Sequence, residues 1–92
     1  MRVTLDALTV LDAIVRAGSF AAGAERLYRV RSAVSYTIHK LERDLGITVF
    51  DRSGHRAKLT DAGMQLLNDG RDLLRQAERL ERQVLEVDAG RR

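Results

Sequence analysis

The chain has 92 residues, enough for one small domain and little more. It contains no Cys, which excludes disulfide scaffolds and thiolate metal sites. The formal net charge is +3, and residues 26–58 hold eight Lys and Arg against three Asp and Glu, whereas residues 61–92 hold six against seven. A basic segment of this kind suits a polyanionic partner, although on charge alone a solvated surface of mixed sign is an equally good interpretation.

Membrane insertion and export are not predicted. No stretch approaches the roughly 20 apolar residues that a membrane-spanning helix needs. Residues 1–4 lack the long apolar core of a signal peptide. We therefore expect a cytoplasmic protein with no membrane partner.

Two helices are predicted at the start of the chain. Residues 5–17 carry apolar side chains at helical spacing, with Thr4 as the N-cap and Gly18 as a left-handed stop. Ser19 can cap a second helix over residues 20–28, where small side chains allow close approach to another helix.

A third helix is predicted over residues 31–45, after a tight turn at 29–30 and before a stop at Gly46. Its two faces differ in character. The apolar face consists of Val34, Ile38, Leu41 and Leu45, and the polar face of Arg31, Ser32, Ser35, Tyr36, His39, Lys40 and Arg43.

Two short strands are predicted next. Residues 47–51 are mostly β-branched or apolar, residues 57–59 are the expected partner, and a polar loop with a Gly joins them over residues 52–56. Thr60 then caps a long helix over residues 61–87.

The long helix carries an apolar seam whose spacings alternate between four and three residues, as in a coiled coil. A helix of this length cannot bury itself in so small a domain. We therefore expect it to pair with a second copy in a homodimer, the alternative being a helix packed along its own domain. The seam, and the predicted dimer interface, is Leu66, Gly70, Leu73, Ala77, Leu80, Val84 and Val87.

Two helices joined by a short turn, the second with a polar outer face, predict a helix that reads the major groove of double-stranded DNA. Side chains near the start of that helix reach base edges, which indicates Arg31, Ser32, Ser35 and Tyr36. Lys40 is a further candidate contact, although it and Arg43 can equally belong to a solvated face. The hairpin offers Arg52, Arg56 and Lys58 to the phosphate backbone or the minor groove.

Two side chains in this region have structural interpretations. Arg52 can brace the hairpin by pairing with a carboxylate, and this is as well supported as a phosphate contact. Glu42 would be repelled by phosphates, so we expect it in a salt bridge within the domain.

The chain resembles the N-terminal domain of LysR-type transcriptional regulators over about residues 3–88. The resemblance rests on Phe20, Ala24-Glu25-Arg26-Leu27, Ser32-Ala33-Val34-Ser35, Ile38, Leu41-Glu42, Leu45-Gly46, Phe50, Arg52 and Leu59-Thr60-Asp61-Ala62-Gly63. It implies a mainly α fold, a winged helix-turn-helix of three helices and a two-stranded wing over residues 1–60, followed by a linker and dimerisation helix over residues 61–92. It further implies a dimer that binds an inverted-repeat operator to regulate transcription.

Four positions depart from the family pattern. Arg31 replaces the usual Gln, which shifts the expected base preference from adenine to guanine, and Tyr36 replaces an Arg. Val30 replaces a Ser that would cap the reading helix, and Ala21 replaces a hydroxyl side chain that could bind phosphate. The fold is unaffected, but another member's operator cannot be transferred to this chain.

Other functions have less support. A protein-interaction module on a winged scaffold is the alternative, and the basic middle of the chain argues against it. His39 and His55 lack metal-ligand spacing, and no catalytic constellation or phosphate-binding Gly loop is present, so we expect no enzyme activity, metal or cofactor. Family members also carry an effector-binding domain that residues 1–92 do not include, so we expect no small-molecule ligand for this chain.

Overall fold

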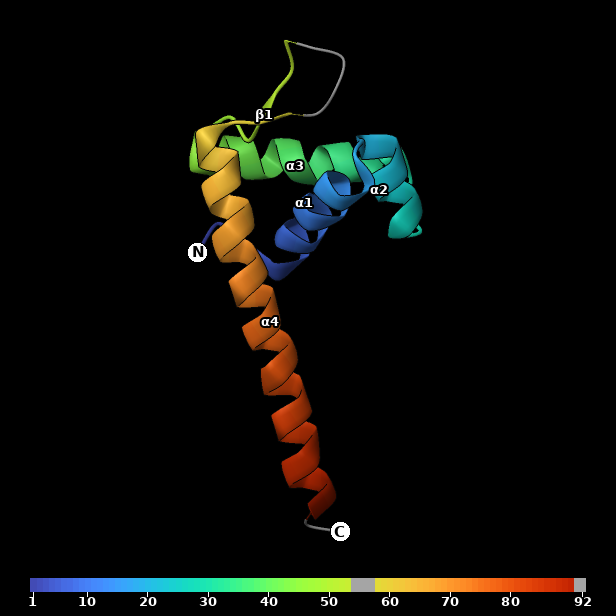
Figure 1. Cartoon of the computed structure of the whole chain (residues 1–92), viewed down its shortest axis with the longest axis vertical. Helices are drawn as coiled ribbons and strands as arrows, with labels where there is room; N and C mark the ends of the chain where they lie inside the picture. Colours follow the sequence, from blue (N-terminus) through green and yellow to red (C-terminus); the bar gives the residue numbers. More distant parts are fainter. Residues whose placement is uncertain (54–57, 91–92) are drawn as a thin grey trace.

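The structure is a computed structural model that describes residues 1–53 and 58–90. Within these residues the chain forms four helices and a two-stranded antiparallel sheet, as expected for a winged helix-turn-helix (Figure 1). Helices α1 to α3 cluster together, and α4 runs away from them, so that the molecule measures 55 × 25 × 18 Å. The elements in chain order are α1 (Leu5–Ala17), α2 (Phe20–Arg26), α3 (Arg31–Leu45), β1 (Phe50–Asp51), β2 (Lys58–Leu59) and α4 (Asp61–Gly90).

Local capping determines where α1 begins and ends. The Thr4 side chain accepts a hydrogen bond from the Ala7 N–H at 3.0 Å, which satisfies a donor that the first helical turn leaves free. Gly18 ends α1 at φ 92°, in the left-handed region, and Ser19 caps α2 by accepting from the Ala22 N–H at 3.0 Å. These predicted caps are confirmed.

Helix α2 ends two residues earlier than predicted. Leu27 is its C-cap, and Tyr28 adopts a φ of 55°, which an α-helix cannot include. Helix α3 has the predicted bounds, and Gly46 ends it at φ 68°. Val30, at the N-cap position of α3, makes no side-chain cap hydrogen bond, as its apolar side chain predicts.

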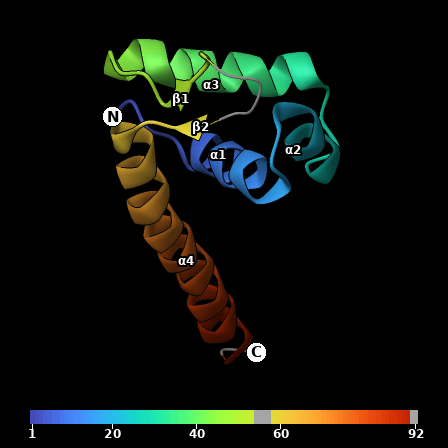
Figure 2. The ribbon, with the colours of Figure 1, turned by 45° about the horizontal axis from the view of Figure 1, so that its top comes forward.

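The core lies where α1, α3, β1 and the start of α4 meet (Figure 2). Of the apolar face predicted for α3, Val34, Ile38 and Leu41 are buried, and Leu45 at the end of the helix is only partly buried. Phe50 packs edge-on against Phe20 of α2, with ring centroids 5.1 Å apart. The buried cluster is Val10, Leu11, Ile14, Ala24, Val34, Ile38, Val49, Phe50 and Leu67.

The first strand is shorter than predicted. Phe50 pairs with Leu59 and Asp51 with Lys58, but residues 47–49 do not join the ladder. Their backbone groups bond elsewhere, with the Ile47 N–H donating to the Glu42 carbonyl at 3.0 Å and the Val49 carbonyl accepting from the Thr60 N–H at 3.0 Å. Ala57, predicted to begin the second strand, lies outside the described residues.

Helix α4 begins as predicted and extends three residues further, to Gly90. Its N-cap is Thr60, whose side chain accepts from the Gly63 N–H at 3.0 Å. The first turns of α4 are part of the core, since Gly63, Leu67 and Gly70 are buried. A single hydrophobic core therefore includes residues on both sides of position 60. Every residue from 78 to 90 is exposed, so this part of α4 stands clear of the rest of the chain (Figure 1).

Among the described residues, no single helix is both long enough and apolar enough to cross a membrane. Helices α1 and α2 pass that test only when taken together, and they are bent by 116° at the break between them.

Candidate nucleic-acid interface

The outer face of α3 is polar and accessible. Of the four residues predicted to read bases, Arg31, Ser32 and Tyr36 are exposed, and Ser35 is partly buried. Tyr36 presents an exposed ring, with 60% of the residue accessible. His39, Lys40 and Arg43 continue the same exposed surface toward the C-terminal end of the helix. One side of α3 is therefore committed to the core and the other is free for a partner.

The cations on this face differ in their environment. Lys40 forms an ion pair with Asp44 one turn away, at 2.6 Å, and this hydrogen bond lowers the pKa of the Asp44 carboxyl. An exposed pair of this kind is weak, so a phosphate can compete for the ammonium group. Within residues 1–53 and 58–90, Arg31 and Arg43 form no salt bridge.

The turn that precedes α3 is tied to α1. Arg29 donates two hydrogen bonds to the Asp6 carboxylate, at 2.6 and 3.1 Å, and this contact lowers the pKa of Asp6. The bidentate pair fixes the start of α3 relative to the first helix. Sequence reasoning missed it, because 23 residues separate the partners and no local pattern connects them.

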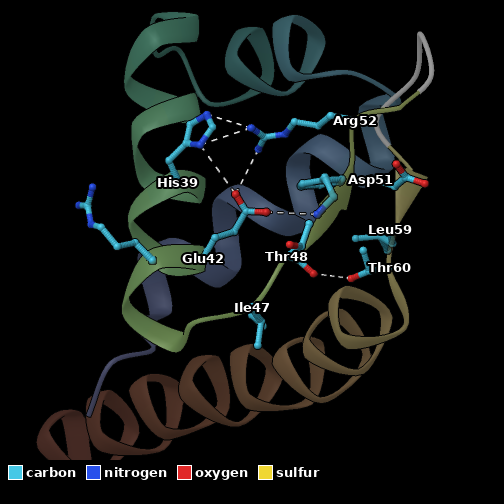
Figure 3. A pocket seen from close by; sticks show the side chains of 10 residues that line it. His39, Glu42, Ile47, Thr48, Asp51, Arg52, Leu59 and Thr60 are labelled. Carbon is cyan, nitrogen blue, oxygen red and sulfur yellow. Dashed lines mark hydrogen bonds and ion pairs between the residues drawn. The ribbon is translucent and has the colours of Figure 1, made fainter.

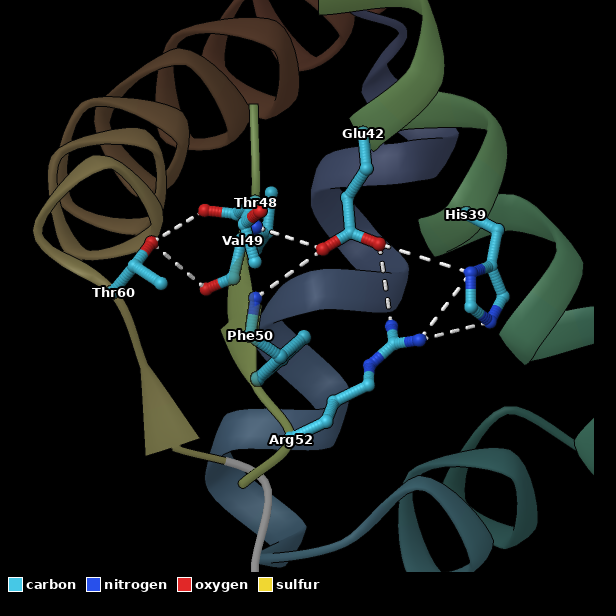
Figure 4. A network of polar contacts seen from close by, with 7 residues as sticks. All are labelled: His39, Glu42, Thr48, Val49, Phe50, Arg52 and Thr60. Atoms are coloured by element: carbon cyan, nitrogen blue, oxygen red, sulfur yellow. Dashed lines mark hydrogen bonds and ion pairs between the residues drawn. The ribbon is translucent and has the colours of Figure 1, made fainter. Parts of the chain in front are cut away.

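Glu42 joins α3 to the wing (Figure 4). One carboxylate oxygen accepts from the Val49 N–H at 2.8 Å and lies 3.4 Å from the Phe50 N. The other accepts from the Arg52 guanidinium at 3.2 Å. The salt bridge predicted for Glu42 is therefore confirmed, and its partner is Arg52.

Arg52 contacts three residues on two helices, Glu42 and His39 on α3 and Phe20 on α2. Besides Glu42, its Nη1 lies 3.1 Å from the Nε2 of His39, and its guanidinium carbon lies 5.8 Å from the centroid of the Phe20 ring. Its side chain is 45% exposed, against 14% for Glu42. The bracing interpretation of Arg52 is thus realised in the structure, and the phosphate contact remains a prediction.

An open groove runs between the second half of α3 and the base of the wing (Figure 3). His39, Glu42 and Arg43 line it from α3, and Asp51 and Arg52 from the wing. Its lining is mixed in charge and its shape is shallow, which suits an extended polar surface better than a small apolar ligand.

The outer wing is described only in part. Lys58 is exposed on β2, opposite Asp51, whose pKa is lowered by hydrogen bonds from Ser53, chiefly from its backbone. Arg56, the predicted contact at the tip of the wing, lies outside the described residues together with His55.

The predicted seam on α4 divides into two parts. Leu66 is half-buried and packs against the core, and Gly70 is buried where a Cβ atom would lie 2.7 Å from the Leu8 side chain of α1. These two positions therefore pack within the chain. From Leu73 onward the seam is accessible, with Leu73 49%, Leu80 61%, Val84 56% and Val87 57% exposed and Ala77 partly buried.

Three helices, an antiparallel wing and an exposed polar face on α3 define a winged helix-turn-helix protein. Residues 5–64 match the family described as "Bacterial regulatory helix-turn-helix protein, lysR family", and the chain belongs to this family. The family expected from the sequence is confirmed, and with it the class of protein, a DNA-binding domain of a transcription regulator.

Individual relatives agree. The chain is 50% identical to the uncharacterized HTH-type transcriptional regulator YeeY of Escherichia coli (strain K12), over 98% of this chain and 29% of YeeY. It therefore spans less than a third of the length of that relative. The fold is similar to that in the BenM_DBD/catB site 1 DNA complex, with a TM-score of 0.92 at 24% identity over 98% of this chain and 97% of that one. The CbnR_DBD–DNA complex gives a TM-score of 0.85 at 31% identity over 94% and 99% of the two chains.

Proposed function

We propose that this chain binds double-stranded DNA in a sequence-specific manner, as a homodimer at an inverted-repeat operator, to regulate transcription. The observation that carries the proposal is that α3 has two different faces, a largely buried apolar face and a largely exposed face of polar and cationic side chains. Helix α3 is of the size that the major groove of B-DNA admits. The relatives are transcription regulators, and the structural neighbours BenM_DBD and CbnR_DBD are in complexes with DNA.

In this proposal α3 supplies the base contacts. Arg31 is exposed and has no carboxylate partner in the described part of the chain, so its guanidinium can donate two hydrogen bonds to a guanine. Ser32, Ser35 and Tyr36 supply further contacts to bases or phosphates, and Lys40 reaches a phosphate by leaving Asp44. From the wing, Lys58 contacts the backbone or the minor groove, and Arg56, which lies outside the described residues, is a further predicted contact.

The exposed half of α4 supplies the dimer interface. Leu73, Leu80, Val84 and Val87 form an apolar stripe on a helical segment with no core of its own, and Ala77 completes the stripe. Burying such a stripe against a second copy removes apolar surface from water, which favours association. Two paired helices would place two copies of α3 on the symmetric halves of an operator.

The test is a selection from a random duplex library, followed by affinity measurements of the winning duplexes at several salt concentrations. We expect an enriched inverted repeat, a steep loss of affinity with salt, and a guanine that is no longer selected by the Arg31→Ala variant. Uniform binding without enrichment would reject sequence-specific reading. Absence of binding at low salt would reject DNA as the partner and favour a protein-interaction module.

A further inference from the structure

The segment that leads into the wing is held from both sides (Figure 4). On the α3 side, Glu42 accepts hydrogen bonds from the backbone N–H groups of Val49 and Phe50. On the α4 side, Thr60 donates to the carbonyl of Thr48 at 2.5 Å through its hydroxyl group and to that of Val49 at 3.0 Å through its N–H. The backbone donors of this segment thus face α3, and its acceptors face the start of α4.

The wing depends on these contacts for its orientation. In the described residues its ladder consists of two residue pairs, Phe50 with Leu59 and Asp51 with Lys58. So short a hairpin is not stable alone, and its own hydrogen bonds do not determine its orientation relative to the rest of the domain. Its base must therefore determine where the wing points relative to α3.

Glu42 is the one side chain in the described structure that contacts both the backbone of this base and a wing side chain, Arg52. Its side chain is 14% exposed, and besides these contacts it lies 3.8 Å from the Nδ1 of His39 on the same helix. A carboxylate is repelled by phosphates, so Glu42 cannot itself contribute a favourable contact to the DNA backbone.

We propose that Glu42 is a positioning residue for DNA binding, which sets the distance and direction of the wing so that α3 and Lys58 reach the duplex together. The proposal rests on the proposed function, since it explains how α3 and the wing contact the same DNA duplex. Glu42 acts through the β1 backbone and through Arg52, which on this view serves the wing as a brace.

The Glu42→Gln variant distinguishes a positioning role from a purely electrostatic effect, because the two predict opposite changes in DNA affinity. Removal of a negative charge from a DNA-binding domain by itself strengthens binding. Loss of the Arg52 contact and weakening of the backbone contacts displaces the wing and weakens binding. Glu25→Gln makes the same chemical change at an exposed site on α2 and is the matched control.

The experiment is a double-mutant cycle between Glu42→Gln and Lys58→Ala, measured as affinity for the selected duplex. We expect Glu42→Gln to bind about tenfold more weakly than the parent. Glu25→Gln should bind as the parent does or slightly more tightly. Lys58→Ala should weaken the parent severalfold yet have little further effect in the Glu42→Gln background, because the wing is already displaced.

Equal losses from Lys58→Ala in both backgrounds, or undiminished affinity of a folded Glu42→Gln variant, would overturn the proposal. If Glu42→Gln does not fold, the cycle is run with Arg52→Gln, which leaves both backbone hydrogen bonds of Glu42 in place; strict additivity with Lys58→Ala would then reject the brace. If Lys58→Ala has no effect in the parent, positioning of the wing is rejected. DNA reading by α3 still stands in that case, provided that Arg31→Ala weakens binding.

Discussion

Arg71 on α4 donates to the Asp12 carboxylate on α1 at 2.6 Å, although 59 residues separate the two in the sequence. Asp12 also accepts from Arg16 one turn further along α1. Burial raises the pKa of Asp12, but the hydrogen bonds from Arg71 and Arg16 outweigh that effect, so the pKa lies below its usual value of 3.8. The contact fixes the direction in which α4 leaves the winged domain.

The free energy of unfolding should therefore depend on the protonation of Asp12. A carboxyl whose pKa is lowered by folding stabilises the protein above its unfolded pKa, and this contribution is lost as the pH falls through the folded pKa. We expect Asp12→Asn to lose about 1 to 2 kcal/mol at pH 7. Between pH 7 and a pH below about 4, the free energy of unfolding measured with urea should decrease less for Asp12→Asn than for the parent, because the variant has no carboxyl to protonate at this position. An identical pH dependence in the two proteins would show that Asp12 does not contribute to the pH dependence of stability.

Tyr28 has an unfavourable backbone conformation, and its side chain is not packed against other residues. It has a φ of 55° and is 97% exposed, so replacement of its side chain costs almost no packing. We expect Tyr28→Gly to raise the free energy of unfolding by roughly 0.5 to 1 kcal/mol, because Gly adopts the left-handed region without steric cost. Gly46→Ala is the converse control, since φ is 68° there and no atom lies within 4 Å of an added Cβ; it should lose about 1 kcal/mol. A destabilised Tyr28→Gly would contradict this account.

Two glycines of α4 should respond differently to Ala. A Cβ at Gly63 would overlap the Val49 carbonyl oxygen, which is backbone and cannot move without the wing base. A Cβ at Gly70 would have the end of the Leu8 side chain as its nearest neighbour, at 2.7 Å, and a side-chain end can shift. We expect Gly63→Ala to cost about 2 kcal/mol or more and Gly70→Ala clearly less, partly offset by the higher helix propensity of Ala. Thermal unfolding of both variants under one condition is the measurement, and the reverse order would contradict the packing described.

Val30 leaves the N-terminus of α3 without a side-chain cap. Its backbone already has the extended conformation of an N-cap, with φ −74° and ψ 149°. Val30→Thr keeps the shape of the side chain and adds an acceptor, so we expect a gain of about 1 kcal/mol in the free energy of unfolding. Val30→Ala lacks the acceptor and should show no gain in the same thermal melts.

If the exposed seam of α4 forms the dimer interface, charged side chains placed in it should prevent dimerisation. Leu73→Glu combined with Leu80→Glu should produce monomers in light scattering, because burial of two carboxylates in an apolar interface is unfavourable. Leu85→Glu is the control, since Leu85 is 67% exposed and lies outside the seam. A dimer that persists in the double variant would place the interface elsewhere.

Much of this fold could be predicted from the sequence, because its boundaries are local. Thr4, Ser19, Gly18, Gly46 and Thr60 act on backbone groups within a few residues, so their types alone indicated where the helices begin and end. The alternation of apolar and polar residues likewise predicted the buried and exposed faces of α3.

Tertiary structure decided which distant groups meet. Periodicity placed Gly70 and Leu80 on one seam, yet Gly70 faces Leu8 and Leu80 faces solvent, because α1 crosses only the first turns of α4. The sequence left Arg52 open between a brace and a phosphate contact, and its proximity to Glu42 appears only when the wing folds back onto α3. Caps and amphipathic faces depend on neighbours in the chain, whereas ion pairs and helix crossings depend on the path between distant segments, which short-range patterns do not specify.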